Sequence, residues 1–299
     1  MIKYKNLIRH IGSIISISSI VYLGMIFKDN LNQLDTQFIN FKSIFISLFL
    51  VILSMFSYGL FSKAWVMLLE KKYPNFKLKI AFQIIGMSQI AKYLPGNVAH
   101  IVGRFYLSKK LLSSTDITTT LLIETILFTG TSFLIGCGYI IYSDIYSVIP
   151  KSDLIIVFTV FSSIVLATYL GLKILNKNYD TSYINTQSIF KSLFIYLLLP
   201  IIGGLTIYVI FNCILQSTPL PFLLCASAFS LSFLAGFIVP GAPGGIGVRE
   251  YIFTILLTPF VAPILALQAI LIFRLISLMS DVVLFFISKS STHATTRQT

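Results

Sequence analysis

Five charged residues stand inside or beside long runs of apolar sequence, where an uncompensated charge is costly. They are Arg104, Glu124, Arg249, Glu250 and Arg274. Such a residue must face protein or a wet cavity and find a partner, so it indicates function by default. Because the guanidinium group of arginine can form two parallel hydrogen bonds to phosphate or carboxylate, the three arginines predict a site for an anionic group.

Two of these arginines end segments with matching sequences, PGNVAHIVGRFY at 95–106 and PGAPGGIGVREY at 240–251. Both begin with Pro-Gly and share Ile, Arg and Tyr at the same later positions. A backbone this rich in Gly and Pro cannot stay helical, and its freed polar groups are too costly to leave facing lipid. Each break must therefore be buried in protein or line a wet cavity. Alternatively, the breaks merely kink packed helices and the arginines extend to the membrane interface.

A helix that starts after such a break presents unpaired N–H groups and a partial positive charge, which suit an anion. We therefore expect Gly244, Gly245 and His100, which lie at the two breaks, to contribute to the same site as the arginines. The alternative for His100 is a hydrogen-bonded packing residue.

Glu124 shares one narrow helical stripe with Thr120 and Thr131, so this stripe is expected to face protein or water. The carboxylate could neutralise one of the arginines, or it could titrate as a proton-coupling group.

In the last apolar run, Arg274, Ser277 and Asp281 share a helical face. Arg274 could complete a cationic lining with the other two arginines. The alternative, which we favour, is that it pairs internally with Asp281 or Glu124.

The composition places these residues in a polytopic membrane protein. Of 299 residues, 56% are hydrophobic and 11% charged, and the mean hydropathy is +0.90. The net charge of +12 comes from Lys and Arg in short connections, which indicates topology determinants and contact with anionic lipid, and predicts no nucleic-acid partner. No long stretch looks water-soluble, so an appended catalytic domain is not expected.

The predicted fold class is an all-α polytopic membrane protein with about six full spans plus two broken or re-entrant helical hairpins. The hairpins cover about 78–107 and 222–262. We expect a single integral membrane domain over 1–299, with repeat halves near 1–142 and 154–288 and a flexible tail at 289–299. The expected full spans are 8–27, 43–69, 117–142, 154–175, 191–215 and 264–288.

Positive charge alternates along the short connections, which predicts cytoplasmic N and C termini; the bacterial inner membrane is what the family resemblance given below implies. This orientation requires the two broken regions to enter from opposite faces. Paired broken segments in corresponding halves are typical of a transporter with an inverted repeat and a site near the midplane. An extra pair of thin full spans is the alternative.

Motifs of enzyme chemistry do not occur in the sequence: there is no HExxH, CxxC, GxSxG or P-loop pattern. We therefore expect no enzyme activity, no metal and no cofactor.

The segments KYLPGNVAHIVGR and PGGIGVREY, together with Glu124 and Arg274, resemble the transmembrane region of the lysylphosphatidylglycerol synthase family, the flippase-like domain of multiple-peptide-resistance-factor proteins. The resemblance runs from about 10 to 288. It implies that Arg104, Glu124, Arg249, Glu250 and Arg274 form the family's polar core. The family's Glu-Arg pair is altered, because Thr125 follows Glu124. The aminoacyl-transfer domain is absent from the sequence, so lysyl transfer is not inherited.

These features favour a flippase-like transporter of an anionic, aminoacylated or polyprenyl-phosphate-linked lipid, with a phosphate-containing headgroup as the ligand. The alternative is a non-transporting membrane partner of an envelope glycosyltransferase or lipid-modifying enzyme. A third, weaker reading is an intramembrane lipid-modifying enzyme.

Overall fold

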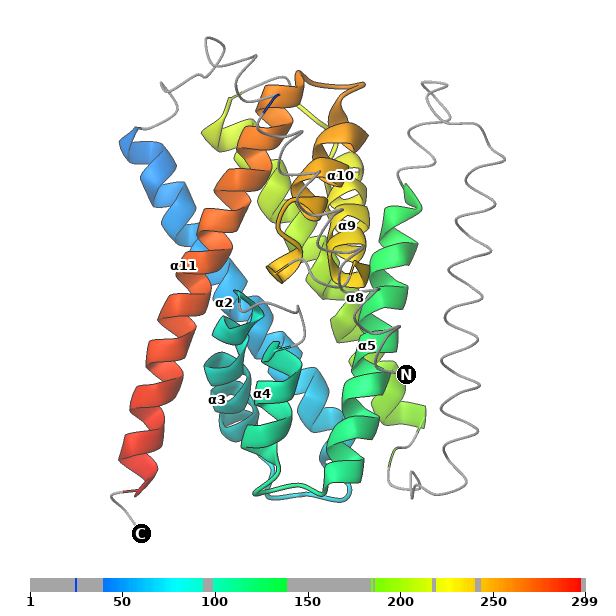
Figure 1. Cartoon of the computed structure of the whole chain (residues 1–299), viewed down its shortest axis with the longest axis vertical. Coiled ribbons are helices and arrows are strands. Elements are labelled where there is room, and N and C mark those ends of the chain that lie inside the picture. The colour runs from blue at the N-terminus through cyan, green and yellow to red at the C-terminus, as the bar shows by residue number, and fades with distance from the viewer. Residues whose placement is uncertain are drawn as a thin grey trace, which may run out of the picture.

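The computed structural model describes residues 25, 40–93, 99–138, 184, 186–216, 219–239 and 243–296. Within these residues all regular structure is helical. Four helices are long and apolar enough to cross a membrane, and they form an elongated bundle (Figure 1). They are α2 (Phe41–Leu69), α5 (Ser114–Gly136), α8 (Thr186–Val209), which continues as the π-helical turn η4 (Ile210–Ile214), and α11 (Pro263–Thr296).

These four helices correspond to four of the six predicted spans, those at 43–69, 117–142, 191–215 and 264–288. The predicted spans at 8–27 and 154–175 lie outside the described residues, apart from residue 25. The chain is therefore confirmed as an all-helical protein with several candidate spans. The helix that holds the last predicted span continues to Thr296, through most of the segment expected to be a flexible tail.

Helix α2 shows how an apolar sequence is used on both sides of the bundle. Asn40 caps its first turn by accepting a hydrogen bond from the Ser43 backbone N–H at 2.9 Å. Large side chains along one face, including Phe45, Phe49 and Phe56, are exposed, as expected for a lipid-facing surface. Its Trp65 is fully buried on the other face.

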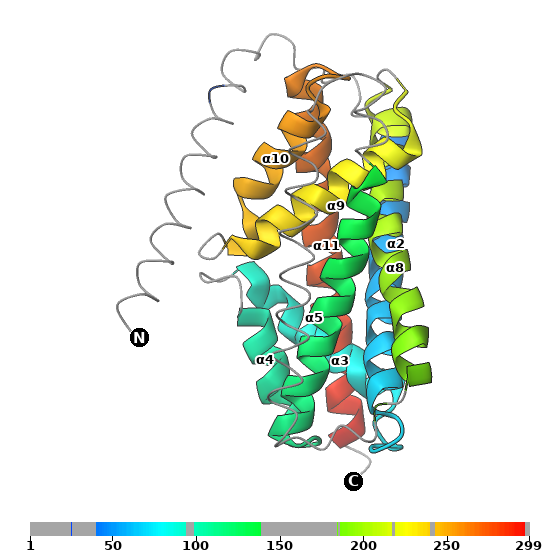
Figure 2. The ribbon, with the colours of Figure 1, turned by 90° about the vertical axis from the view of Figure 1, so that its right-hand side faces the viewer.

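Two shorter helical hairpins fill the space between the long helices. The first comprises α3 (Leu78–Gln89), the 3-10 turn η2 (Ile90–Tyr93) and α4 (Ala99–Ser108). The second comprises α9 (Phe222–Ile238), the 3-10 turn η5 (Pro243–Gly245) and α10 (Val248–Leu257). The first occupies the lower half of the molecule and the second the upper half, and their breaks face each other at mid-height (Figures 1 and 2).

The ends of the two hairpins lie at opposite ends of the bundle. The lysine-rich connection at 70–79, the Lys109–Lys110 turn and the C-terminal end of α11 lie at one end of the bundle (Figure 1). The start of α9 and the end of α10 lie at the other. The described parts of the two hairpins therefore lie toward opposite ends of the bundle.

The second break depends on glycine. Gly244, Gly245 and Gly247 all have positive φ, at 56°, 72° and 85°. A Cβ atom on Gly245 would also lie 2.9 Å from the Cα and carbonyl oxygen of Gly236 in α9. This close backbone approach brings the start of α10 against α9 and fixes where the residues after the break point.

Gly245→Ala is expected to destabilise the protein, because the new methyl group meets backbone atoms that cannot move aside. The positive φ of residue 245 is also unfavourable for alanine. The cost should be at least about 1–3 kcal/mol, seen as a lower midpoint of thermal unfolding in detergent. Gly59→Ala is the matched control, since nothing lies within 4 Å of its added Cβ in helix α2. That variant should be neutral or slightly stabilising. Equal midpoints for the two variants would contradict the close approach.

Candidate functional site: a cavity between two broken helices

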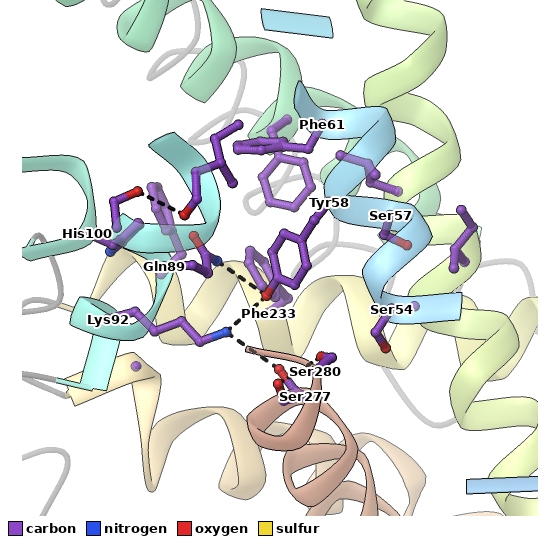
Figure 3. Close-up of a pocket in the computed structure, with 18 of the residues that line it drawn as sticks. Ser54, Ser57, Tyr58, Phe61, Gln89, Lys92, His100, Phe233, Ser277 and Ser280 are labelled. Atoms are coloured by element: carbon purple, nitrogen blue, oxygen red, sulfur yellow. Dashed lines mark hydrogen bonds between the residues drawn. The ribbon is translucent and has the colours of Figure 1, made fainter. Parts of the chain in front are cut away.

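A cavity of about 250 Å³ lies where the two hairpin breaks meet. Every described helical element except η4 contributes to its lining. Figure 3 shows Gln89 of α3 and Tyr58 of α2 reaching toward each other, and Lys92 extending toward Ser277. Four cationic side chains line this space: Lys92, Arg104, Arg249 and Arg274.

Arg104 of α4 is held by Glu124 of α5 in a two-fold ion pair. The two Nη–Oε distances are 2.5 and 2.6 Å, and both residues are buried. The guanidinium also stacks on Trp65, with its carbon 3.8 Å from the ring centroid. The expectation that Glu124 neutralises an arginine is thus confirmed. Because both carboxylate oxygens are occupied, Arg104 is not an unpaired anion-binding cation.

The polar stripe of α5 lies inside the protein, as the sequence predicts. Thr120 accepts a hydrogen bond from the Trp65 indole at 3.2 Å. Thr131 donates to the backbone carbonyl of Tyr196 at 3.0 Å. Both threonines are buried with Glu124, so they orient the ion pair and its neighbours instead of facing lipid.

Arg274 of α11 pairs with Glu250, so the predicted pairing with Asp281 or Glu124 is wrong. Its Nη1 also donates to the carbonyl oxygen of Gly244 at 2.9 Å. The other Glu250 oxygen accepts the Gly247 backbone N–H at 2.7 Å, at the start of α10. This N–H therefore goes to a carboxylate of the chain, where the sequence predicted a ligand. From the sequence, Glu250 was predicted to belong to the anion site beside the break. Its role as a cap of the first turn of α10 was not predicted.

Asp281 of α11 binds Lys92 at the first break, and the sequence did not predict this contact. The Lys92 Nζ to Asp281 Oδ2 distance is 2.6 Å. The Tyr58 and Tyr93 hydroxyls donate to the same carboxylate at 2.5 and 2.6 Å. This cluster ties η2 to α2 and α11. The signal in the sequence was Asp281 on the Arg274 helical face, but nothing there indicated which cation it meets.

Arg249 differs from the other three cations. Among the residues that the structure describes, no carboxylate pairs with it, and its Nε is buried without an acceptor. Its guanidinium carbon lies 4.2 Å from the Phe233 ring centroid. Gly236 permits this position, because a Cβ there would lie 3.2 Å from the Arg249 Cβ. Arg249 therefore presents an uncompensated charge to the cavity.

Comparison with known proteins now adds to this geometry. A family model of the lysylphosphatidylglycerol synthase TM region matches residues 11–284. The chain belongs to this family. The predicted resemblance is confirmed, and membership indicates a multi-pass membrane protein with a lipid-related role. No curated protein matches the chain.

The remaining predicted site residues of this family member divide between cavity and scaffold. His100 and Gly244 line the cavity, and the His100 Nδ1 is buried with no described partner. Gly245 packs on Gly236 and does not line the cavity. Glu250 acts through Arg274 and the start of α10. The structure therefore brings the predicted set together, but in different roles.

Glu124→Gln should destabilise the protein by about 3–5 kcal/mol, because it leaves Arg104 charged and buried without its counter-ion. Thermal unfolding of the purified protein in detergent measures this. Glu70→Gln is the control, since Glu70 is exposed at the end of α2. The double change Arg104→Met with Glu124→Leu should recover much of the loss. If the double variant is as unstable as Glu124→Gln, the uncompensated charge of Arg104 does not account for the loss of stability.

Proposed function

We propose that the protein moves a lipid with a phosphate-containing headgroup between the leaflets of a bacterial cytoplasmic membrane, without enzymatic chemistry. The observation that carries the proposal is Arg249, a half-buried cation that lines the cavity and has no carboxylate partner among the described residues. A cation withdrawn from water without a partner is expensive unless a ligand compensates it. An anionic headgroup supplies that charge.

The arrangement of the hairpins supports this proposal. In the proposed topology, each hairpin is re-entrant and the two belong to inverted halves of the chain. The α3–α4 hairpin lies toward the lysine-rich end of the bundle and the α9–α10 hairpin toward the other end (Figure 2), and both contribute residues to the cavity lining. Movement of one hairpin at a time would give a headgroup access from one leaflet and then the other. The acyl chains would stay in the lipid.

The distribution of lysines over the bundle supports an orientation of the protein in the membrane. Exposed lysines Lys71, Lys77, Lys109 and Lys110 lie at one end of the bundle. By the positive-inside rule this end is cytoplasmic. The C-terminal end of α11 lies there too, and we place the N-terminus on the same side.

A non-transporting partner of an envelope glycosyltransferase or lipid-modifying enzyme is the second candidate. It is favoured by the internal pairing of Lys92, Arg104 and Arg274. A scaffold needs these ion pairs only for rigidity. It does not explain the unpaired Arg249, which is why transport is preferred.

The test is a leaflet-exchange assay in proteoliposomes with a fluorescent phosphatidylglycerol. Arg249→Gln should lower the protein-dependent rate by roughly 10- to 150-fold, the equivalent of losing a charge-assisted hydrogen bond of about 1.5–3 kcal/mol. Lys63→Gln, an exposed cation of α2, is the matched control and should keep the wild-type rate.

Two results would count against the proposal. Equal rates for Arg249→Gln and the wild type would remove Arg249 from the mechanism. A wild-type rate no higher than that of protein-free vesicles, for every phosphate-containing lipid tried, would favour the non-transporting partner.

A further inference from the structure

We infer that the cavity selects a lipid phosphodiester with one negative charge and a small neutral headgroup rich in hydroxyls, such as glycerol or a single sugar. It would discriminate against aminoacylated lipids, whose headgroups carry an ammonium group, and against diphosphate-linked lipids. This inference rests on the proposed function only in that it places a lipid headgroup in this cavity.

The first argument is the charge balance. Lys92, Arg104, Arg249 and Arg274 line the cavity, and the carboxylates bonded to them are those of Asp281, Glu124 and Glu250. With His100 neutral, these described groups leave one net positive charge. A phosphodiester carries one negative charge and would balance it. A lysylated phosphodiester carries net positive charge, and a diphosphate carries more negative charge than the site can balance.

The second argument is the state of the carboxylate oxygens. Glu124 accepts both of its hydrogen bonds from Arg104. Glu250 accepts from Arg274 and from the Gly247 N–H. A ligand ammonium would have to share one of these oxygens, or those of Asp281, with a donor already bound there, beside a cation paired with the same carboxylate.

The Asp281 carboxylate is the most crowded of the three. Tyr58 donates to one of its oxygens, and Tyr93 and Lys92 contact the other. Its exposed fraction is 0%. A cationic headgroup would have to displace at least one of these three side chains to reach it.

The third argument is the nature of the unused polar atoms. The Arg104 Nε, the Arg249 Nε and the Arg274 Nη2 are buried N–H donors with no acceptor among the described residues. All three residues line the cavity. Unused donors require a ligand with acceptor oxygens, which the non-bridging oxygens of a phosphodiester provide.

The fourth argument is size and the remaining lining. The cavity, at about 250 Å³, is below the range of about 300–1,000 Å³ typical of pockets for drug-sized ligands. Ser54 and Ser57 donate to the carbonyls of their own helix at 2.9 and 3.2 Å, so their oxygens remain available as acceptors. Headgroup hydroxyls can donate to these oxygens. Figure 3 shows both serines at the wall formed by α2.

Competition binding to the purified, detergent-solubilised chain tests the inference without requiring transport. A fluorescent phosphatidylglycerol is displaced by phosphatidylglycerol, lysyl-phosphatidylglycerol or a diphosphate-linked lipid with matched chains. Phosphatidylglycerol should compete at least about 10-fold better than the lysylated lipid, because juxtaposed like charges cost several kcal/mol. It should also compete better than the diphosphate.

A charge reversal sharpens the test. Arg249→Glu should weaken phosphatidylglycerol binding and strengthen binding of the lysylated lipid, whereas Lys63→Glu should change neither. If Arg249→Glu does not fold, the wild-type competition still decides. Equal competition by all three lipids, or preference for the lysylated or diphosphate lipid, would overturn the inference. Selective binding without leaflet exchange would sustain the inference and reject the proposed transport.

Discussion

The structure depends on one constraint: a charge within the bundle must be compensated there, because water cannot do it. The chain meets this constraint three times with its own carboxylates. Arg104 takes Glu124, Arg274 takes Glu250, and Lys92 takes Asp281. Each pair joins two different helical elements. The ion pairs therefore compensate the charges and at the same time hold α4 to α5, α10 to α11, and η2 to α11. Arg249 is the exception among the described cations of the cavity, and in the proposed transporter the headgroup of the lipid compensates it.

The backbone is subject to a parallel constraint. Interrupting a helix inside the bundle frees N–H and C=O groups that must find partners. At the second break, the Gly244 carbonyl is taken by Arg274 and the Gly247 N–H by Glu250. One ion pair thus satisfies two backbone groups, one on each side of Gly245 and Ile246. The charged pair that seems costly in apolar surroundings makes the break possible, and the break in turn sets the direction in which Arg249 points.

Much of this could be predicted from the sequence. Long apolar runs fixed four helices to within a few residues, except at the end of α11, and Gly-Pro clusters located both hairpins. The partners were harder to predict. Arg274 and Asp281 share a helical face, yet each pairs with a residue of another element, Glu250 and Lys92. Sequence periodicity shows which side chains share a face of a helix. Which residue each side chain pairs with depends on how the helices pack against one another.

The same limit explains why the matched motifs suggested more symmetry than the site has. Arg104 and Arg249 occupy equal positions in their motifs, but a carboxylate on α5 faces only Arg104 among the described residues. Around Arg249 the corresponding neighbour is the aromatic ring of Phe233, which attracts a cation weakly and cannot neutralise it. Two matching positions therefore hold one arginine in an ion pair and one arginine with no carboxylate partner among the described residues. A site with one free cation can hold its ligand and still release it, since the other charges need not reorganise when the ligand leaves.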